Sequence, residues 1–381
     1  MAAVEPLDID HLRHLSGIKW SRYGPDVLPA WVADMDIAPP PVVVEALRGL
    51  VERGDFGYNR HALLQLPDAF ARWQADRHNW AIDPADVRVF CDVLHAIDTA
   101  LWLLTGPGDG VVLFTPIYPP FLNALATTGR RLIDVPLDPD GWRLDSERLS
   151  AAIDDRTRAI LLCNPHNPTG RVFDEGELAT IARVAEEHDL LILSDEVWAD
   201  LVHPGATHRP MSTIGPEAAA RTLTISAASK AFNLAGLRCA VAHVGHAGLA
   251  TRLAELPAHL LGAVGTPGAE ATLAAWTAGG SWLEAVRAHL TERRDQLTGR
   301  LAADLPGVGY SPPEATYLAW LDLRSYGLGD NPAEVLLDRA GVALSSGPDF
   351  GVHGLGRTRL NFATSASILD QIIDRLVAAL A

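Results

Sequence analysis

The sequence has few cysteines, a deficit of positive charge and no long apolar run. Its three cysteines are too few and too scattered for a disulfide framework or a zinc site. Acidic residues outnumber basic ones by 47 to 31, and the resulting net charge of −16 disfavours contact with the phosphate backbone of nucleic acids. No segment contains the roughly 18 uncharged apolar residues that a membrane span needs. We therefore expect neither a nucleic acid nor a membrane as partner, and no metal centre.

The N-terminus also lacks the basic residues of a secretion signal. Residues 1–10 contain three acids and no lysine or arginine, so we expect no signal peptide and a cytoplasmic protein. Apolar residues make up 48% of the chain and charged ones 20%, which is typical of a folded protein with a sizeable core. At about 150 residues per domain, the 381 residues predict two or three domains.

Lysine is almost absent. Of the 31 basic residues only Lys19 and Lys230 are lysines, and all the others are arginines. A lysine amine can lose its proton and form a Schiff base with a carbonyl compound, which arginine cannot do. The count alone leaves a second explanation equally open, namely a general replacement of lysine by arginine with two accidental survivors.

From about residue 87, β-rich runs alternate with amphipathic stretches of helical periodicity. The β-rich runs cover residues 87–91, 111–114, 131–135, 159–163, 190–194, 222–226 and 239–244. This alternation predicts an α/β fold with a mostly parallel, doubly wound sheet. In such sheets ligands bind at the carboxyl ends of the strands.

The pattern changes after about residue 280. A long helix over 281–304 precedes strands over 316–323 and 357–363, with one helix between these strands and another after them. This is the pattern of a small α+β domain. We therefore predict an N-terminal segment (1–45) that packs with the small domain, a large domain (46–280) and the small C-terminal domain (281–381).

Several predicted strands are followed by polar residues. Asn167 lies in a rigid Asn-Pro turn after the strand at 159–163, Asp195 follows the strand at 190–194, and Lys230 follows the strand at 222–226. A helix beginning near Val93 offers free N–H groups to an anion. Taken singly, the segment with Asn167 could be an ordinary tight turn, and Asp195 could be the N-cap of a helix. Jointly they place an amide, a carboxylate, an amine and an anion site at one sheet edge, as pyridoxal 5′-phosphate (PLP) requires.

These motifs have the order of a known family. They cover residues 31–36, 56–60, 115–121, 164–170, 194–197, 229–237 and 359–363. With them the whole chain resembles the fold-type I PLP enzymes of the class I/II aminotransferase superfamily. Within it, residues 31–36 and 228–234 resemble the cystathionine β-lyase and cysteine-S-conjugate β-lyase branch (PatB/MalY type).

The resemblance implies two catalytic residues and a set of cofactor contacts. Lys230 would carry PLP as an imine and later move the Cα proton, and Tyr118 would stack on the pyridine ring. The remaining contacts would be Asp195 at the pyridine nitrogen, Asn167 at the 3′-oxygen, and Ser229, Arg238 and the backbone amides of Val93 and Leu94 at the phosphate.

The resemblance also implies a substrate site and a partner. Arg359 would bind the substrate α-carboxylate through two parallel hydrogen bonds, with the backbone at Ala33 closing over it. Arg357 is the alternative, and the Arg-x-Asn pattern favours Arg359. Tyr58 would reach the phosphate of a neighbouring subunit, which implies a homodimer with shared active sites.

Two residues depart from the pattern of the family. Trp198 stands where the superfamily usually has tyrosine and this branch often has histidine, and an indole cannot share a proton with the 3′-oxygen. Asp92 stands where the branch has glycine, and an acid beside a phosphate is unfavourable unless it points away. The effect of both departures is open.

The resemblance implies cleavage of L-cysteine S-conjugates, cystathionine among them, to a thiol, pyruvate and ammonia. The same residues also serve an aminotransferase, or a specialised tailoring enzyme that acts on a cysteine conjugate. A regulatory protein without catalysis is a further alternative, against which the joint presence of Lys230, Asp195, Asn167 and Arg359 argues. The sequence leaves open which side chain the substrate carries.

Overall fold

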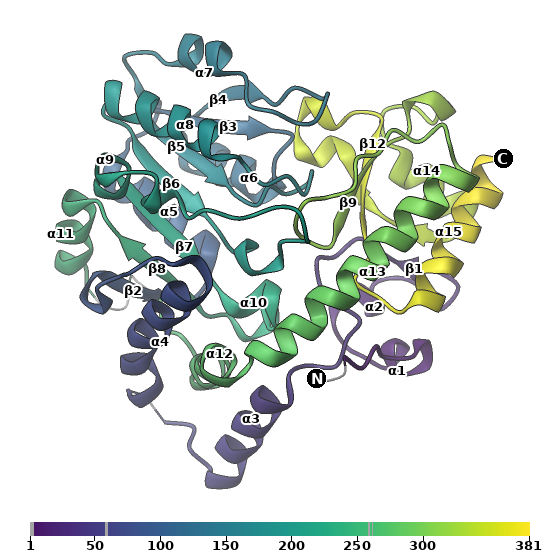
Figure 1. Cartoon of the computed structure of the whole chain (residues 1–381), viewed down its shortest axis with the longest axis horizontal. Helices are drawn as coiled ribbons and strands as arrows, with labels where there is room; N and C mark the ends of the chain where they lie inside the picture. The colour runs from purple at the N-terminus through teal and green to yellow at the C-terminus, as the bar shows by residue number, and fades with distance from the viewer. Residues whose placement is uncertain (1–3, 58–59, 258–259, 261) are drawn as a thin grey trace.

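A seven-stranded sheet forms the centre of the larger part of the protein (Figure 1). The computed structural model describes residues 4–57, 60–257, 260 and 262–381. The strand order is β2-β8-β7-β6-β5-β3-β4. The strands are β2 (Val87–Phe90), β3 (Gly110–Thr115), β4 (Arg131–Pro136), β5 (Thr157–Cys163), β6 (Leu191–Asp195), β7 (Thr222–Ser226) and β8 (Ala240–Val244). Only β8 runs against its neighbours. The predicted α/β fold with a mostly parallel sheet is therefore confirmed.

Successive side chains of the buried strands point to opposite faces of the sheet, and both faces are covered by helices. Leu113, Leu161 and Leu193 pack on one face with helices α5, α6 and α11. Their neighbours Val112 and Ile160 pack on the other face with α7, α8 and α9. The helices of these two layers are α5 (Val93–Leu104), α6 (Pro119–Thr128), α7 (Ser146–Ala152), α8 (Glu175–Glu187), α9 (Pro216–Ala220) and α11 (Ala247–Glu255).

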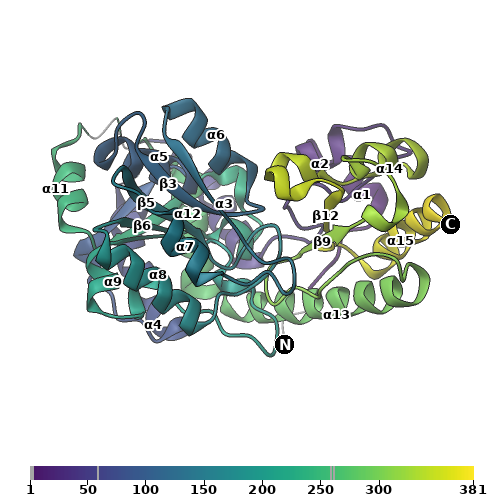
Figure 2. The same cartoon turned by 90° about the horizontal axis from the view of Figure 1, so that it is seen from above.

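A second sheet lies beside the first (Figure 2). Its three antiparallel strands have the order β11-β12-β9, with β9 (Leu318–Asp322), β11 (Ser345–Ser346) and β12 (Arg357–Asn361). The long helix α13 (Gly280–Asp304) leads to this part, which also contains α14 (Pro332–Ala340) and α15 (Ala366–Leu380). The N-terminal segment joins it, because β1 (Leu28–Pro29) pairs in parallel with β10 (Val342–Ala343). The domain boundaries at residues 45 and 280 stay a prediction.

Six further α-helices complete the described structure. They are α1 (Ile9–Arg13), α2 (Ile18–Ser21), α3 (Pro41–Arg53), α4 (His61–His78), α10 (Ala228–Ala231) and α12 (Thr266–Ala278). Helix α3 ends at Gly54, whose φ of 62° is a left-handed conformation that glycine adopts without strain. Within the described ranges, no helix is both long enough and apolar enough to cross a bilayer.

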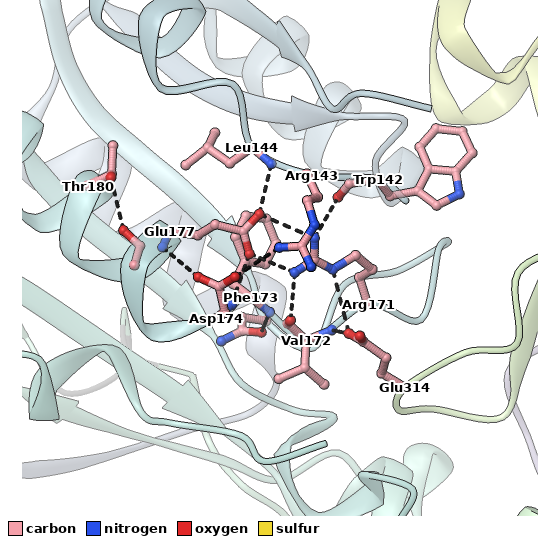
Figure 3. A network of polar contacts seen from close by, with 12 residues as sticks. Trp142, Arg143, Leu144, Arg171, Val172, Phe173, Asp174, Glu177, Thr180 and Glu314 are labelled. Carbon is pink, nitrogen blue, oxygen red and sulfur yellow. Dashed lines mark hydrogen bonds and ion pairs between the residues drawn. The ribbon is translucent and has the colours of Figure 1, made fainter. Parts of the chain in front are cut away.

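A buried ion-pair network lies beside the turn at 164–170 (Figure 3). Arg171 donates to both carboxylate oxygens of Glu177 at 3.2 and 2.6 Å, and its Nε lies 3.5 Å from Glu314. Glu177 also forms a capping box with Asp174 at the start of α8. The network therefore connects the turn, α8 and the loop that precedes β9.

We expect Arg171→Ala to lower the free energy of unfolding by about 3–5 kcal/mol, because it leaves the buried Glu177 carboxylate without its cation. Arg143→Ala is the matched control: Arg143 pairs with Asp174 in the same network, but both side chains are more than half exposed. The control should cost about 1 kcal/mol or less. Urea unfolding measures both variants, and equal losses would contradict the prediction.

Candidate active site

A cavity of about 830 Å³ lies at the carboxyl ends of β5, β6 and β7. Because β2 runs parallel to β7, the start of α5 lies at the same edge of the sheet. The structure brings ten of the predicted site residues to this cavity: Ala33, Val93, Leu94, Tyr118, Asn167, Asp195, Ser229, Lys230, Arg238 and Arg359. Tyr58, the remaining one, lies outside the described residues.

Lys230 points its amine into the cavity. It lies on the short helix α10 that follows β7, and its Nζ donates to the carbonyl oxygen of Ala33 at 3.0 Å. The Nζ also lies 5.6 Å from the centre of the Trp198 ring, a distance typical of a cation–π contact. Burial lowers the pKa of Lys230 below its ordinary value. A lysine in this state forms a Schiff base more readily than an exposed one.

Asp195 is a buried carboxylate that few hydrogen bonds stabilise. It ends β6 and accepts hydrogen bonds from the backbone N–H of Val197 at 3.2 Å and, weakly, from the Cys163 thiol at 3.9 Å. Burial raises the pKa of Asp195 to about 7. In the described part of the chain no basic side chain lies within ion-pair distance of it. A positively charged ring nitrogen in the cavity would supply the missing partner.

The turn at 164–170 holds Asn167 at the cavity wall. Asn167 Oδ1 accepts a hydrogen bond from Arg359 Nη1 at 2.9 Å. Gly170 closes the turn with a φ of 70°, and a Cβ there would collide with Pro313. The turn thus needs glycine for both backbone conformation and close approach.

Arg359 is a buried guanidinium whose bonds go to neutral groups. Besides Asn167, it donates to Trp31 O at 2.9 Å and to Ser345 Oγ at 3.0 Å, while its Nε is buried without a partner. Burial lowers the pKa of Arg359 to about 10, so it stays charged at neutral pH. Arg357, the alternative, pairs with Asp322 at 3.0 Å. Of the two, Arg359 is the arginine that an incoming carboxylate can reach.

The predicted phosphate end of the cavity contains an acid. Asp92 caps α5 by accepting from the backbone N–H of His95 at 2.8 Å, and its other oxygen pairs with Arg238. The arginine expected to bind the phosphate is therefore already paired with a carboxylate. Tyr118, at the start of α6, is largely buried, and burial raises the pKa of its hydroxyl.

We expect Asp92→Asn to increase the affinity for PLP by about tenfold, because it removes a negative charge from the phosphate end and frees Arg238. Asparagine keeps the N-cap hydrogen bond, so α5 should persist. Titration of the cofactor-free protein with PLP measures the change. Asp174→Asn, at the N-cap of α8, is the matched control. Unchanged or weaker binding in the Asp92 variant would refute the prediction.

Two side chains, those of Tyr317 and Asn361, hold the segment 31–36 over the cavity. The buried Tyr317 donates to Ala33 O at 2.8 Å, the same oxygen that accepts from Lys230. Asn361 Nδ2 donates to the carbonyl oxygens of Val32 and Asp34 at 2.6 and 2.7 Å. The Arg-x-Asn pattern signalled Asn361, but nothing in the sequence distinguished Tyr317 from an ordinary core tyrosine.

The second lysine has a structural place. Lys19 is buried and pairs with Asp36 at 2.9 Å, and it also donates to Asp34 O at 3.0 Å. Trp20 donates to the other oxygen of Asp36 at 2.6 Å. These bonds fix the end of the segment 31–36, so the two lysines serve different purposes.

The residues present fit PLP. The cavity offers an amine for the aldehyde, the undercompensated carboxylate of Asp195 for a ring nitrogen, and the amide of Asn167 for a ring oxygen. The free N–H groups at the start of α5 and Ser229 fit a phosphate, whereas the carboxylate of Asp92 opposes it. The orphaned Nε of Arg359 fits an additional carboxylate.

Comparisons with known proteins identify the family of the chain. Residues 32–376 match the family model for aminotransferase class I and II. Cystathionine beta-lyase PatB of Bacillus subtilis is 33% identical, over 95% of this chain and 96% of that protein. The cystathionine beta-lyase of Corynebacterium glutamicum is 32% identical, over 98% and 99%. The crystal structure of cystalysin from Treponema denticola, which contains PLP, superposes with a TM-score of 0.94 at 28% identity, over 100% and 99% of the two chains.

Proposed function

Since the chain belongs to the aminotransferase class I and II family, we propose that it is a PLP-dependent C–S β-lyase. It cleaves an L-cysteine S-conjugate, with water, to a thiol, pyruvate and ammonia. Curated relatives of this length that are named cystathionine beta-lyase support the reaction class. The cofactor contributes an electron sink for the negative charge that develops at Cα.

Each residue of the cavity has a task in this reaction. Lys230, with its lowered pKa, takes the Cα proton when its amine is free, and Ala33 O holds the resulting ammonium. The carboxylate of Asp195 keeps the ring nitrogen protonated, and Asn167 donates to the ring oxygen. Arg359 binds the α-carboxylate and fixes the Cα–H bond relative to the lysine.

One observation carries the proposal: a buried amine, a buried carboxylate and a buried guanidinium line one cavity, and no acid among the described residues pairs with that guanidinium. This set serves the removal of a proton from the Cα of an amino acid. Transamination begins with the same step, so only the products separate the two reactions.

The test is an assay with L-cystathionine and S-methyl-L-cysteine in the absence of any 2-oxo acid. We expect equal amounts of thiol and pyruvate. A holoenzyme that forms no thiol, but converts an amino acid when a 2-oxo acid is added, would be an aminotransferase and would overturn the proposal. A protein that binds no PLP would support a regulatory role.

We also propose that the protein acts as a homodimer in the cytoplasm. Two large apolar side chains that are near Tyr58 in the sequence support the dimer: Phe56 and Leu64 are 66% and 60% exposed. The described structure contains no disulfide at any of the three cysteines, as is typical of a reducing compartment. Light scattering of the purified protein tests the dimer, and a monomer mass would contradict it.

A further inference from the structure

The cavity extends beyond the predicted cofactor contacts. Residues that do not belong to the PLP site line its remaining part, among them Arg22, Tyr23, Trp31, Glu334 and Asp349. They come from the segment after α2, from the start of α14 and from the loop between β11 and β12. Since Arg359 and Lys230 fix the amino-acid end of a substrate, this part is available to its side chain, which is the leaving group.

Arg22 is a cation held in place by two aromatic rings. The centre of its guanidinium lies 5.0 Å from the centre of the Trp31 ring and 5.7 Å from that of Tyr23. The two rings pack edge to face, 5.9 Å apart. Such contacts are worth about 0.5–1 kcal/mol each at exposed sites, and they restrict the long arginine side chain. Arg22 is thus positioned before any ligand binds.

Arg22 has no acidic partner of its own. Across the described ranges, no carboxylate lies within ion-pair distance of its guanidinium. Several other exposed arginines, such as Arg48 with Glu45, do have one. The positive charge of Arg22 is therefore free to bind a negatively charged ligand in the cavity.

Trp31 connects Arg22 with the predicted carboxylate site. The backbone oxygen of Trp31 accepts a hydrogen bond from Arg359 Nη2 at 2.9 Å, and the indole ring of Trp31 contacts the guanidinium of Arg22. One residue thus positions both cations, so a ligand bound at Arg359 has a second cation one side chain farther along the cavity wall.

We propose that Arg22 binds a carboxylate at the far end of the leaving thiol, so that the enzyme favours S-conjugates with such a group over neutral ones. The inference rests on the proposed lyase function and narrows its substrate class. Glu334 and Asp349 line the same cavity, and no ion-pair partner of either is found among the described residues. An ammonium group on the same leaving chain would in addition face these two acids.

The test compares S-(2-carboxyethyl)-L-cysteine with S-propyl-L-cysteine, which has a neutral chain of similar length. In Arg22→Gln, kcat/KM for the carboxyethyl compound should fall about tenfold, while that for the propyl compound should stay within about twofold. Arg48→Gln, far from the cavity lining, is the matched control and should change neither value. An unchanged ratio of the two values in Arg22→Gln would overturn the inference.

A second measurement separates this inference from the proposed function. If the wild-type holoenzyme releases thiol from neither compound, the lyase function fails while Arg22 can still be tested. Calorimetric titration of the wild-type and Arg22→Gln holoenzymes with both compounds should then show weaker binding of the carboxyethyl compound alone in the variant. Equal losses for both compounds, or none, would overturn the role of Arg22.

Discussion

Lys230→Ala is expected to lower kcat/KM for thiol release by about 10⁴-fold, because the variant loses the amine that moves the Cα proton. No other described residue with a titratable amine lines the cavity. The substitution should leave the fold intact, since Lys230 lies on a short helix at the cavity edge. Pyruvate release from an S-conjugate measures the loss, and circular dichroism checks the fold.

Because the sequence contains only two lysines, the lysine that binds the cofactor can be identified directly. Borohydride reduction of the holoenzyme followed by peptide mass spectrometry should place the cofactor mass on Lys230, and Lys19 is the other lysine that could compete. Lys19→Arg is the matched control: it keeps the charge opposite Asp36, so turnover should persist even if stability falls. A cofactor mass on Lys19, or turnover in Lys230→Ala, would remove the basis of the proposed mechanism.

Asp195→Asn should lower kcat by about 10²–10³-fold and yet stabilise the cofactor-free protein. A neutral amide cannot keep a ring nitrogen protonated, so the electron sink weakens. At the same time the substitution removes a buried charge that lacks an ion-pair partner. The side chain can still accept the backbone N–H of Val197, so no hydrogen bond need be lost there. Turnover and thermal unfolding of the same variant give the two readouts.

The stabilisation should depend on pH in a defined direction. Burial raises the pKa of Asp195 from 3.8 to about 7, so between these values the folded wild type binds more protons than the unfolded chain. Its free energy of unfolding therefore falls as the pH rises from about 4 to about 7, by about 4 kcal/mol in total. The free energy of unfolding of Asp195→Asn should not decrease in this way, because the variant has no carboxyl group at this position. Its advantage should be full at pH 8 and vanish near pH 4, and a constant difference across this range would contradict the assignment.

Most of the fold was predictable because it follows from local patterns. All seven β-rich runs became strands of the central sheet, and β7 has the predicted bounds. Buried parallel strands are short apolar runs between turns, and amphipathic helices repeat at their own period, so each element leaves its mark in consecutive residues. The reversal of β8 and the order of the strands left no such mark, since they depend on which segments pair.

The site, too, was predictable from the sequence only in part. The amino-acid sequence by itself determined which candidate residues meet at the cavity, because Lys230, Asp195 and Asn167 lie at or just after the ends of strands, and these ends meet at one edge of a parallel sheet. Only the tertiary structure decided what acts on them. The contact of Trp198 with Lys230, the pairing of Asp92 with Arg238 and the Tyr317 bond to Ala33 join residues far apart in the chain, and Arg22 reaches the cavity through the packing of its segment. Such contacts arise from packing, which sequence neighbours do not encode.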